Sequence, residues 1–344
     1  MNSAPLPELP AQPVTLRTDG AVDRLTATAE KAKQYAERAR SPSTRRAYKA
    51  DWDHFTAFCD GHGLTALPTA PETLGLYLTE LAETGYKAST LQRRLSAVRE
   101  AHRIAQHPLD TGHPAVREVW RGIRGVIGTA KTPKAPVVGT DILAMLATLS
   151  GDTTAGRRDR ALLLLGFASA LRRSELVGLN VGPGQTPGDP AGHGWIEFCD
   201  EGIRIRLARS KTDQQGEGRS IGVPFGVHPD TCPVAAVQAW LDHAGIVHGP
   251  LFRPVSRAGT IRLDRLTDRS VALIVKRAAE AAGLDPAAYA GHSLRSGHAT
   301  AVAMNDGDER TIQAQLGHAS AEMTRRYIRE ANIFRRSSAG KLGL

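Results

Sequence analysis

The chain has 344 residues, a length typical of about two domains, with 41% apolar and 23% charged residues. This composition excludes a wholly disordered protein, and no apolar run approaches the roughly 18–20 residues that a membrane-spanning helix needs. Lys and Arg number 44 against 35 Asp and Glu, a net charge of +9. Cys59, Cys199 and Cys232 are too few and too scattered for a disulfide framework or a zinc site, so we expect a reduced, cytoplasmic protein.

The positive charge is spread over both halves of the chain. Residues 1–132 contain 18 basic and 14 acidic residues, and residues 133–344 contain 26 and 21. This distribution fits a protein that surrounds an extended polyanion with two domains. It fits a basic globular protein without a polyanionic partner equally well. The basic excess itself is compatible with nucleic acid, with an anionic membrane surface or with neither. Charge alone therefore leaves the partner open.

The first part of the chain predicts an all-helical domain over residues 21–128. Residues 1–20 contain four prolines and no hydrophobic periodicity, so we expect a disordered arm there. Amphipathic periodicity, as in the face formed by Tyr48, Trp52 and Phe55, then indicates a series of helices. The predicted helices span about 21–40, 43–59, 72–84, 89–106 and 114–127.

A polar segment with two prolines, residues 129–136, is predicted to be a linker. The remainder, residues 137–344, begins with helices over 141–149 and 157–170 and is helical again from Pro233 nearly to its end. Between them lie three short extended runs, which we expect to form a small antiparallel three-stranded sheet. These runs are 195–199, 203–208 and 220–223. The predicted fold class is mainly α, with a helical domain followed by a mixed, mostly helical one.

Four segments of the second part concentrate reactive side chains. A spacing of three places His292 and Arg295 on one helical face, and an arginine fork suits a pair of phosphate oxygens. Any one of these residues, taken singly, is more often an ordinary surface or core residue, whereas the whole set in this order indicates a site for a phosphate. The segments are 170–176 (ALRRSEL), 210–212 (SKT), 292–295 (HSLR) and 316–318 (LGH), the last followed by Tyr327.

The set resembles the motifs of the tyrosine recombinase (phage integrase) family. The family pattern GLRxSEL is matched by ALRRSEL, the pattern HxLRHxxAT by HSLRSGHAT (292–300), and LGHxSxxxTxxY by LGHASAEMTRRY (316–327). Ser296 and Gly297 replace the usual His and Thr. The layout looks most similar to the branch that includes Cre recombinase, although Cre has tryptophan at the position of His318. The resemblance covers about residues 22–335 and is weaker in the first part.

The resemblance implies a site-specific DNA recombinase with a tyrosine nucleophile. Tyr327 would attack a DNA phosphodiester, leaving a 3′-phosphotyrosine and a free 5′-hydroxyl. Arg172 and Arg295 would hold the non-bridging oxygens, His292 would accept the tyrosine proton, and His318 would donate to the phosphate.

Two further residues have implied roles. Lys211 would protonate the leaving 5′-oxygen, and Glu175 would orient its neighbours. Because the bond energy is kept in the phosphotyrosine, the resemblance implies no nucleotide, no metal and no other cofactor. Two alternatives stay open: a sequence-specific DNA-binding protein of the same fold that no longer cuts, and an enzyme similar to type IB topoisomerases.

The expected partner is double-stranded DNA, bound by a homotetramer on two duplexes, with no role for a membrane. Only about 20 residues precede the first predicted helix, so we expect no separate arm-binding domain and expect short inverted-repeat sites. In this family the tail docks into a neighbouring protomer, which we expect of Ile333 and Phe334. Basic and polar residues of two helices in the first part are candidate DNA contacts, although a solvated helix face would have the same composition. They are Lys87, Thr90, Arg93, Arg94, Arg99, Arg117, Arg121 and Arg124.

Overall fold

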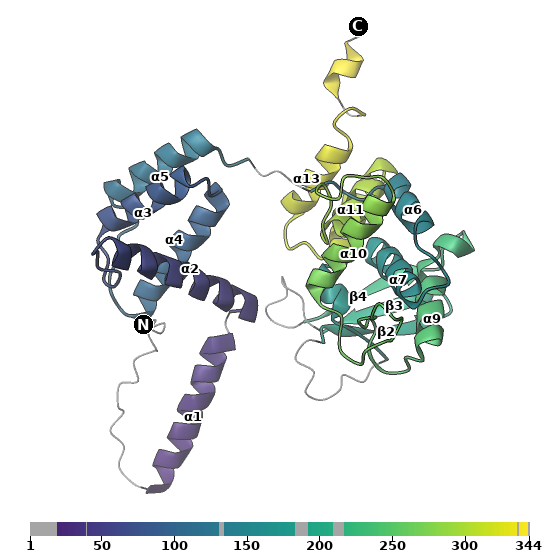
Figure 1. Ribbon diagram of the computed structural model, residues 1–344, viewed down its shortest axis with the longest axis horizontal. Helices are drawn as coiled ribbons and strands as arrows, with labels where there is room; N and C mark the ends of the chain where they lie inside the picture. Colours follow the sequence, from purple (N-terminus) through teal and green to yellow (C-terminus); the bar gives the residue numbers. More distant parts are fainter. Residues whose placement is uncertain are drawn as a thin grey trace. The chain divides into compact units, whose positions relative to one another are not determined.

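The protein divides into two compact units, Met1–Thr132 and Pro133–Leu344, in a computed structural model (Figure 1). The structure describes residues 19–38, 40–130, 134–182, 192–208, 217–335 and 337–342. The predicted arm lies outside these residues except for its last two, which begin the first helix. Lys211 and its hairpin tip lie outside them as well.

Unit 1 is helical throughout the part that the structure describes, as the sequence periodicity predicts. α2 packs against α4, and α3 packs against α5. The core between them contains Phe55, Tyr77, Leu78 and Leu91, which are almost completely buried. The helices are α1 (Asp19–Arg38), α2 (Pro42–Gly61), α3 (Pro71–Glu83), α4 (Ala88–Ile104) and α5 (Pro114–Ile127).

Unit 2 surrounds a small sheet with helices, so the predicted mainly α fold class is confirmed. Its helices are α6 (Gly139–Ala147), α7 (Thr154–Ser169), α8 (Arg173–Val177), α9 (Pro233–Ala244), α10 (Asp268–Ala281), α11 (Ser293–Met304), α12 (Glu309–Leu316) and α13 (Ala321–Ala331), with two 3₁₀ turns, η1 (Pro229–Thr231) and η2 (Ser338–Lys341). Its strands are β1 (Leu179–Val181), β2 (Gly194–Cys199), β3 (Gly202–Leu207), β4 (Arg219–Pro224) and β5 (Gly249–Pro250).

The sheet differs from the predicted one in its number of strands. Its order is β4-β3-β2-β1-β5, and the predicted antiparallel arrangement of β2, β3 and β4 is confirmed. β1 adds a parallel strand beside β2, and β5 pairs antiparallel with β1, which makes a mixed sheet of five strands. The prediction missed β1 and β5 because strands of three and two residues are too short to show an alternating pattern.

α7 is the central helix of unit 2 and fixes where the candidate site begins. Leu162, Leu163, Leu164 and Leu165 are all buried, so this helix has no solvated face over that turn. It ends at Ala170, which adopts the left-handed conformation with φ of 54°. The chain therefore turns sharply before Arg172 and presents the next residues at the surface of the helical core.

The last residues of the predicted linker are part of unit 2. The Ala135 N–H donates to the Ala288 carbonyl at 2.8 Å, and the Val137 N–H donates to the Ser293 carbonyl at 3.0 Å. A side chain at Gly297 would overlap the carbonyl of Val137. This close approach gives a structural reason for the glycine that departs from the family pattern.

Among the helices of the described segments, none is both long enough and apolar enough to cross a bilayer.

Candidate active site

Three separate parts of unit 2 contribute the candidate catalytic residues. Arg172 precedes the first turn of α8, His292 and Arg295 lie at the start of α11, and His318 and Tyr327 lie in the turn after α12 and on α13. α11 packs against α12 and α13, and Figure 1 shows α11 beside α13. Packing of α11 is thus what brings the second and third motifs together.

The candidate nucleophile contacts both candidate histidines. His292 Nε2 lies 3.0 Å from the Tyr327 hydroxyl oxygen, a hydrogen-bonding distance. The His318 and Tyr327 rings are nearly parallel, at 13°, with their centroids 6.0 Å apart. Thr324, which is completely buried one turn before the tyrosine, places its hydroxyl 2.9 Å from His318 Nδ1. The tyrosine and both imidazoles are therefore held in one cluster.

Glu175 holds Arg172 in place. One oxygen of this buried carboxylate accepts the Arg172 backbone N–H at 2.9 Å, and the other accepts Nη1 of the same residue at 2.7 Å. A carboxylate in the first turn of a helix is also favoured by the helix dipole. The orienting role that the resemblance implied for Glu175 is thus supported by its contacts.

Arg295 is almost completely buried, with 1% of its surface exposed. Its Nη1 donates to the Ala170 carbonyl at 2.8 Å, and no carboxylate of the described residues lies within ion-pair distance of it. Burial, followed by the charge of Arg172, lowers the pKa of the Arg295 guanidinium to about 10. The charge of Glu175 opposes this shift, although it forms no ion pair with Arg295. A buried cation without an ion-pair partner is costly, and a bound phosphate would supply the negative charge in direct contact with it.

Burial and the same cations shift the pKa values of the two histidines and the tyrosine. Burial, followed by Arg295 and Arg172, lowers the pKa of His318 to about 4 and lowers that of His292 as well. The His292 side chain is exposed, and the causes that lower its pKa favour the neutral imidazole, the form that can accept a proton. Burial raises the pKa of Tyr327, opposed by Arg295, so the phenol keeps its proton until a base removes it.

Sequence reasoning missed Arg219, the first residue of β4. Its guanidinium lies 3.8 Å from the Glu175 carboxylate and contacts the end of α12. The three family motifs contain no such position, and a single arginine at a strand end looks like an ordinary surface charge. Only the fold brings it beside Glu175.

The candidate DNA contacts of unit 1 differ in exposure. Most are exposed, Thr90 is half-buried, and Arg94 is buried with 7% of its surface exposed. Arg93 pairs with Asp51 at 3.1 Å, and Arg124 lies over the ring of Trp120. The exposed candidates are Lys87, Arg93, Arg99, Arg117, Arg121 and Arg124.

Arg94 belongs to a buried polar cluster of unit 1. Its guanidinium lies 4.4 Å from the centre of the Tyr86 ring and 2.9 Å from His54 Nδ1, and its Nη1 donates to the Tyr77 hydroxyl at 3.4 Å. Its Nε lies 3.8 Å from the carboxylate of Asp51, which is itself 3% exposed. These contacts occupy the side chain, so we leave Arg94 out of the DNA interface proposed below.

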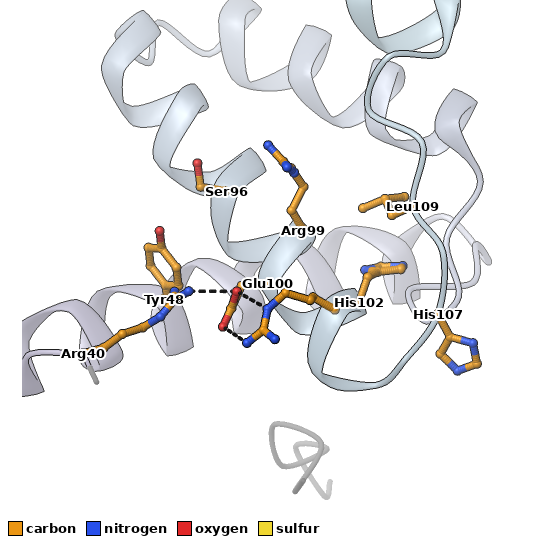
Figure 2. A pocket seen from close by; sticks show the side chains of 9 residues that line it. Arg40, Tyr48, Ser96, Arg99, Glu100, His102, His107 and Leu109 are labelled. Atoms are coloured by element: carbon orange, nitrogen blue, oxygen red, sulfur yellow. Dashed lines mark hydrogen bonds and ion pairs between the residues drawn. The ribbon is translucent and has the colours of Figure 1, made fainter. Parts of the chain in front are cut away.

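Figure 2 shows a pocket of about 340 Å³ beside the C-terminal half of α4. Glu100 pairs with Arg40 at 2.8 Å and with Arg103 at 2.8 Å, while Arg99 extends away from these ion pairs. The pocket contains none of the candidate catalytic side chains. Its basic lining adds to the positive charge of the exposed surface of α4.

Within the segments that the structure describes, no group of three His, Cys, Asp or Glu side chains could hold a metal ion. Cys59, Cys199 and Cys232 are unpaired thiols.

Comparisons with known proteins identify the family. Residues 139–332 match the phage integrase family, and residues 33–107 match the N-terminal SAM-like domain of phage integrases. An integrase/recombinase XerD homologue of Selenomonas ruminantium is 39% identical over 316 residues, covering 91% of this chain and 89% of the relative. A tyrosine recombinase XerC of Pelobacter propionicus is 32% identical, covering 85% of this chain and 86% of the relative.

Solved structures share the fold. The integrase of transposon Tn1549 in complex with transposon right end DNA has a TM-score of 0.56 at 14% identity, covering 88% of this chain and 97% of that one. A λ integrase dimer bound to a core site has a TM-score of 0.55 at 17% identity, covering 91% of this chain and 81% of that one.

The chain therefore belongs to the phage integrase family and is a tyrosine recombinase, an enzyme that transfers DNA strands. Both relatives named above carry Xer names. The resemblance to the Cre branch stays a prediction.

Proposed function

We propose that the protein cleaves and rejoins DNA at short inverted-repeat sites through a phosphotyrosine formed on Tyr327. The observation that carries this proposal is the 3.0 Å contact between Tyr327 and His292 beside the buried, uncompensated Arg295. Together these groups supply a nucleophile, a base and a site for the negative charge of the phosphate.

In the cleavage step, Tyr327 Oη attacks phosphorus while His292 Nε2 accepts the phenol proton. The bond between phosphorus and the 5′-oxygen breaks, and the 5′-oxygen takes a proton, which we assign to Lys211 by the family resemblance alone. The product is a 3′-phosphotyrosine and a 5′-hydroxyl. Arg172 and Arg295 hold the two non-bridging oxygens, where negative charge grows during the attack.

His318 is neutral at pH 7 because its pKa is lowered to about 4. When the Thr324 hydroxyl donates to Nδ1, the proton of the ring lies on Nε2, which can then donate to a phosphate oxygen. A histidine in this state donates a hydrogen bond without adding another cation to a cluster that already holds several.

Rejoining is the reverse reaction with the 5′-hydroxyl of a partner strand. The phosphotyrosine keeps the energy of the broken bond, so the cycle that we propose uses no nucleotide and no metal. Exchange between two duplexes requires four active sites, and we propose a homotetramer on two duplexes acting in the cytoplasm, where the DNA lies.

The proposed DNA interface of unit 1 consists of its exposed cations, which would contact phosphates and fix the register on the duplex. The tail is proposed to dock on a neighbouring protomer, since Ile333 is 66% exposed and Phe334 is 90% exposed. The two alternative functions, DNA binding without cleavage and topoisomerase-like relaxation, have no specific observation in their favour.

The nucleophile is tested with Tyr327→Phe and a nicked DNA substrate that traps the covalent complex. The variant lacks only the attacking oxygen, so we expect it to bind DNA and form no adduct on a denaturing gel. Tyr289→Phe is the matched control, because its hydroxyl contacts Asp141 at 3.1 Å instead of the candidate site. A stable adduct with Tyr327→Phe would overturn the assignment.

A further inference from the structure

Arg219 caps the helix that ends just before His318. Its Nη1 donates to the Gln315 carbonyl at 2.8 Å and to the Ala314 carbonyl at 3.2 Å. These oxygens lie in the last turn of α12, where carbonyl groups have no partner within the helix and carry the negative end of its dipole. A guanidinium at this end therefore stabilises the position at which α12 stops.

The turn that follows is shaped to fit the same guanidinium. Gly317 has φ of 60°, and a Cβ added to it would lie 2.7 Å from Arg219 Cζ. The flat guanidinium group thus lies directly against the glycine backbone. His318 follows at once, and its N–H donates to the Gln313 carbonyl at 3.2 Å. Arg219 therefore contacts the backbone of residues 314–317, which leads directly into the candidate histidine.

The other side of Arg219 faces Glu175. Nη2 lies 3.8 Å from the Glu175 carboxylate, which binds Arg172 through both of its oxygens. Nε and Nη2 of Arg219 are buried and donate no hydrogen bond to any residue that the structure describes. The carboxylate of Glu175 is thus the nearby negative charge that compensates for this burial.

These contacts connect two catalytic groups that lie far apart in the sequence. Glu175 fixes Arg172 at the start of α8, and the end of α12 fixes His318, with Arg219 between them. We propose that Arg219 is a positioning residue, which holds His318 and the Glu175–Arg172 pair in register around the scissile phosphate. This role rests on the recombinase function proposed above and adds a residue that the family motifs do not contain.

The test compares single-turnover cleavage by Arg219→Ala and Arg219→Lys at saturating DNA. We expect Arg219→Ala to cleave about 10- to 100-fold more slowly, as for supporting residues around other catalytic groups, while its DNA affinity changes less than about threefold. Arg219→Lys keeps the charge and a donor for the α12 carbonyls, so it should recover part of the rate. Arg206→Ala is the matched control, since Arg206 lies on β3 and pairs with Glu197.

A second measurement separates positioning from a loss of fold. Arg219→Ala should still unfold cooperatively in urea, and removal of a nearby cation should move the pKa of its His318 upward but keep it below that of an unfolded histidine. Urea unfolding and NMR titration of the imidazole measure these two results. Tyr327→Phe tests the proposed recombinase function, and Arg219→Ala tests the positioning role. Failure of one proposal can therefore be distinguished from failure of the other. If Arg219→Ala cleaved at the rate of Arg206→Ala, or if its His318 titrated as in the parent protein, the positioning role would be overturned.

Discussion

Arg94 in unit 1 and Arg295 in unit 2 are both buried, and the two charges are compensated differently. Arg94 in unit 1 has the carboxylate of Asp51, the Tyr86 ring and the Tyr77 hydroxyl around it. Arg295 in unit 2 has the Ala170 carbonyl and no ion pair among the described residues, and the charge of Glu175 acts on it less than the opposing charge of Arg172. A compensated cation contributes to a stable core, whereas an uncompensated one keeps its capacity to bind an anion.

The difference follows from what each site has to do. A DNA phosphodiester brings a negative charge that grows further in the transition state, so a carboxylate paired with Arg295 would compete with the substrate. Arg94 contacts no reacting group, so its pairing with the Asp51 carboxylate does not compete with the binding of a substrate. A buried arginine is thus informative about catalysis only when its partners are known.

The largest expected effect is on cleavage by Arg295→Met. The variant should lose about 10²- to 10³-fold in single-turnover cleavage, because a donor aimed at the phosphate is removed. Its stability should stay unchanged or rise, because an uncompensated buried charge is replaced by an apolar side chain of similar length. Cleavage assays and urea unfolding of the same preparation measure both quantities. A variant that cleaved normally but unfolded easily would reverse the roles of the two arginines.

Arg94→Met should show the opposite signature. We expect a loss of about 2–3 kcal/mol in the free energy of unfolding, because Asp51 stays buried and keeps only its contact with Arg93. Arg117→Met is the control, because its exposed side chain pairs with the exposed Glu118 at 3.0 Å and should cost under about 1 kcal/mol. Equal losses in the two variants would contradict the structural role of Arg94.

The cation-rich cluster also predicts a dependence of stability on pH. The folded pKa of His318 is about 4, below that of an unfolded histidine, so the unfolded chain binds the proton first as the pH falls. Stability is complete above about pH 6.5 and decreases from there toward pH 4, with a loss of about 2 kcal/mol between pH 7 and pH 5 from this residue.

Urea unfolding at the two pH values measures this loss. His318→Asn cannot titrate in this range and should show a decline smaller by that amount. An identical decline in the variant and the parent protein would argue against a neutral, buried His318.

The smallest effect concerns the exposed arginines of unit 1. Arg121→Ala should reduce the slope of log K for DNA binding against log salt by about 0.9, the contribution of one phosphate contact. Arg94→Met, measured under conditions where it is folded, should leave the slope unchanged because its guanidinium is buried. Binding titrations over a range of salt concentrations give both slopes, and a change with Arg94→Met alone would place that residue at the interface.

Much of the fold follows from local patterns in the sequence. Apolar residues that recur every three or four positions predicted the helices of unit 1. Short extended runs, of which residues 203–207 alternate between apolar and polar, predicted β2, β3 and β4. Such patterns are properties of single elements. The same patterns say nothing about β1 and β5, which exist because neighbouring strands pair with them. Nor could these patterns predict that Arg94 is buried. A charged residue on a helix is normally expected on its solvated face, so its burial becomes visible only when the partners of the side chain are known.

The sequence by itself determined the family and the residues of its motifs, because Arg172, His292, Arg295, His318 and Tyr327 stand in short segments whose spacing is fixed by the chemistry. Only the tertiary structure decided how those segments meet. The contact of Tyr327 with His292, the missing counter-ion of Arg295 and the place of Arg219 beside Glu175 all depend on residues far apart in the chain. Burial and charge compensation are properties of the packed fold, and no local pattern records them.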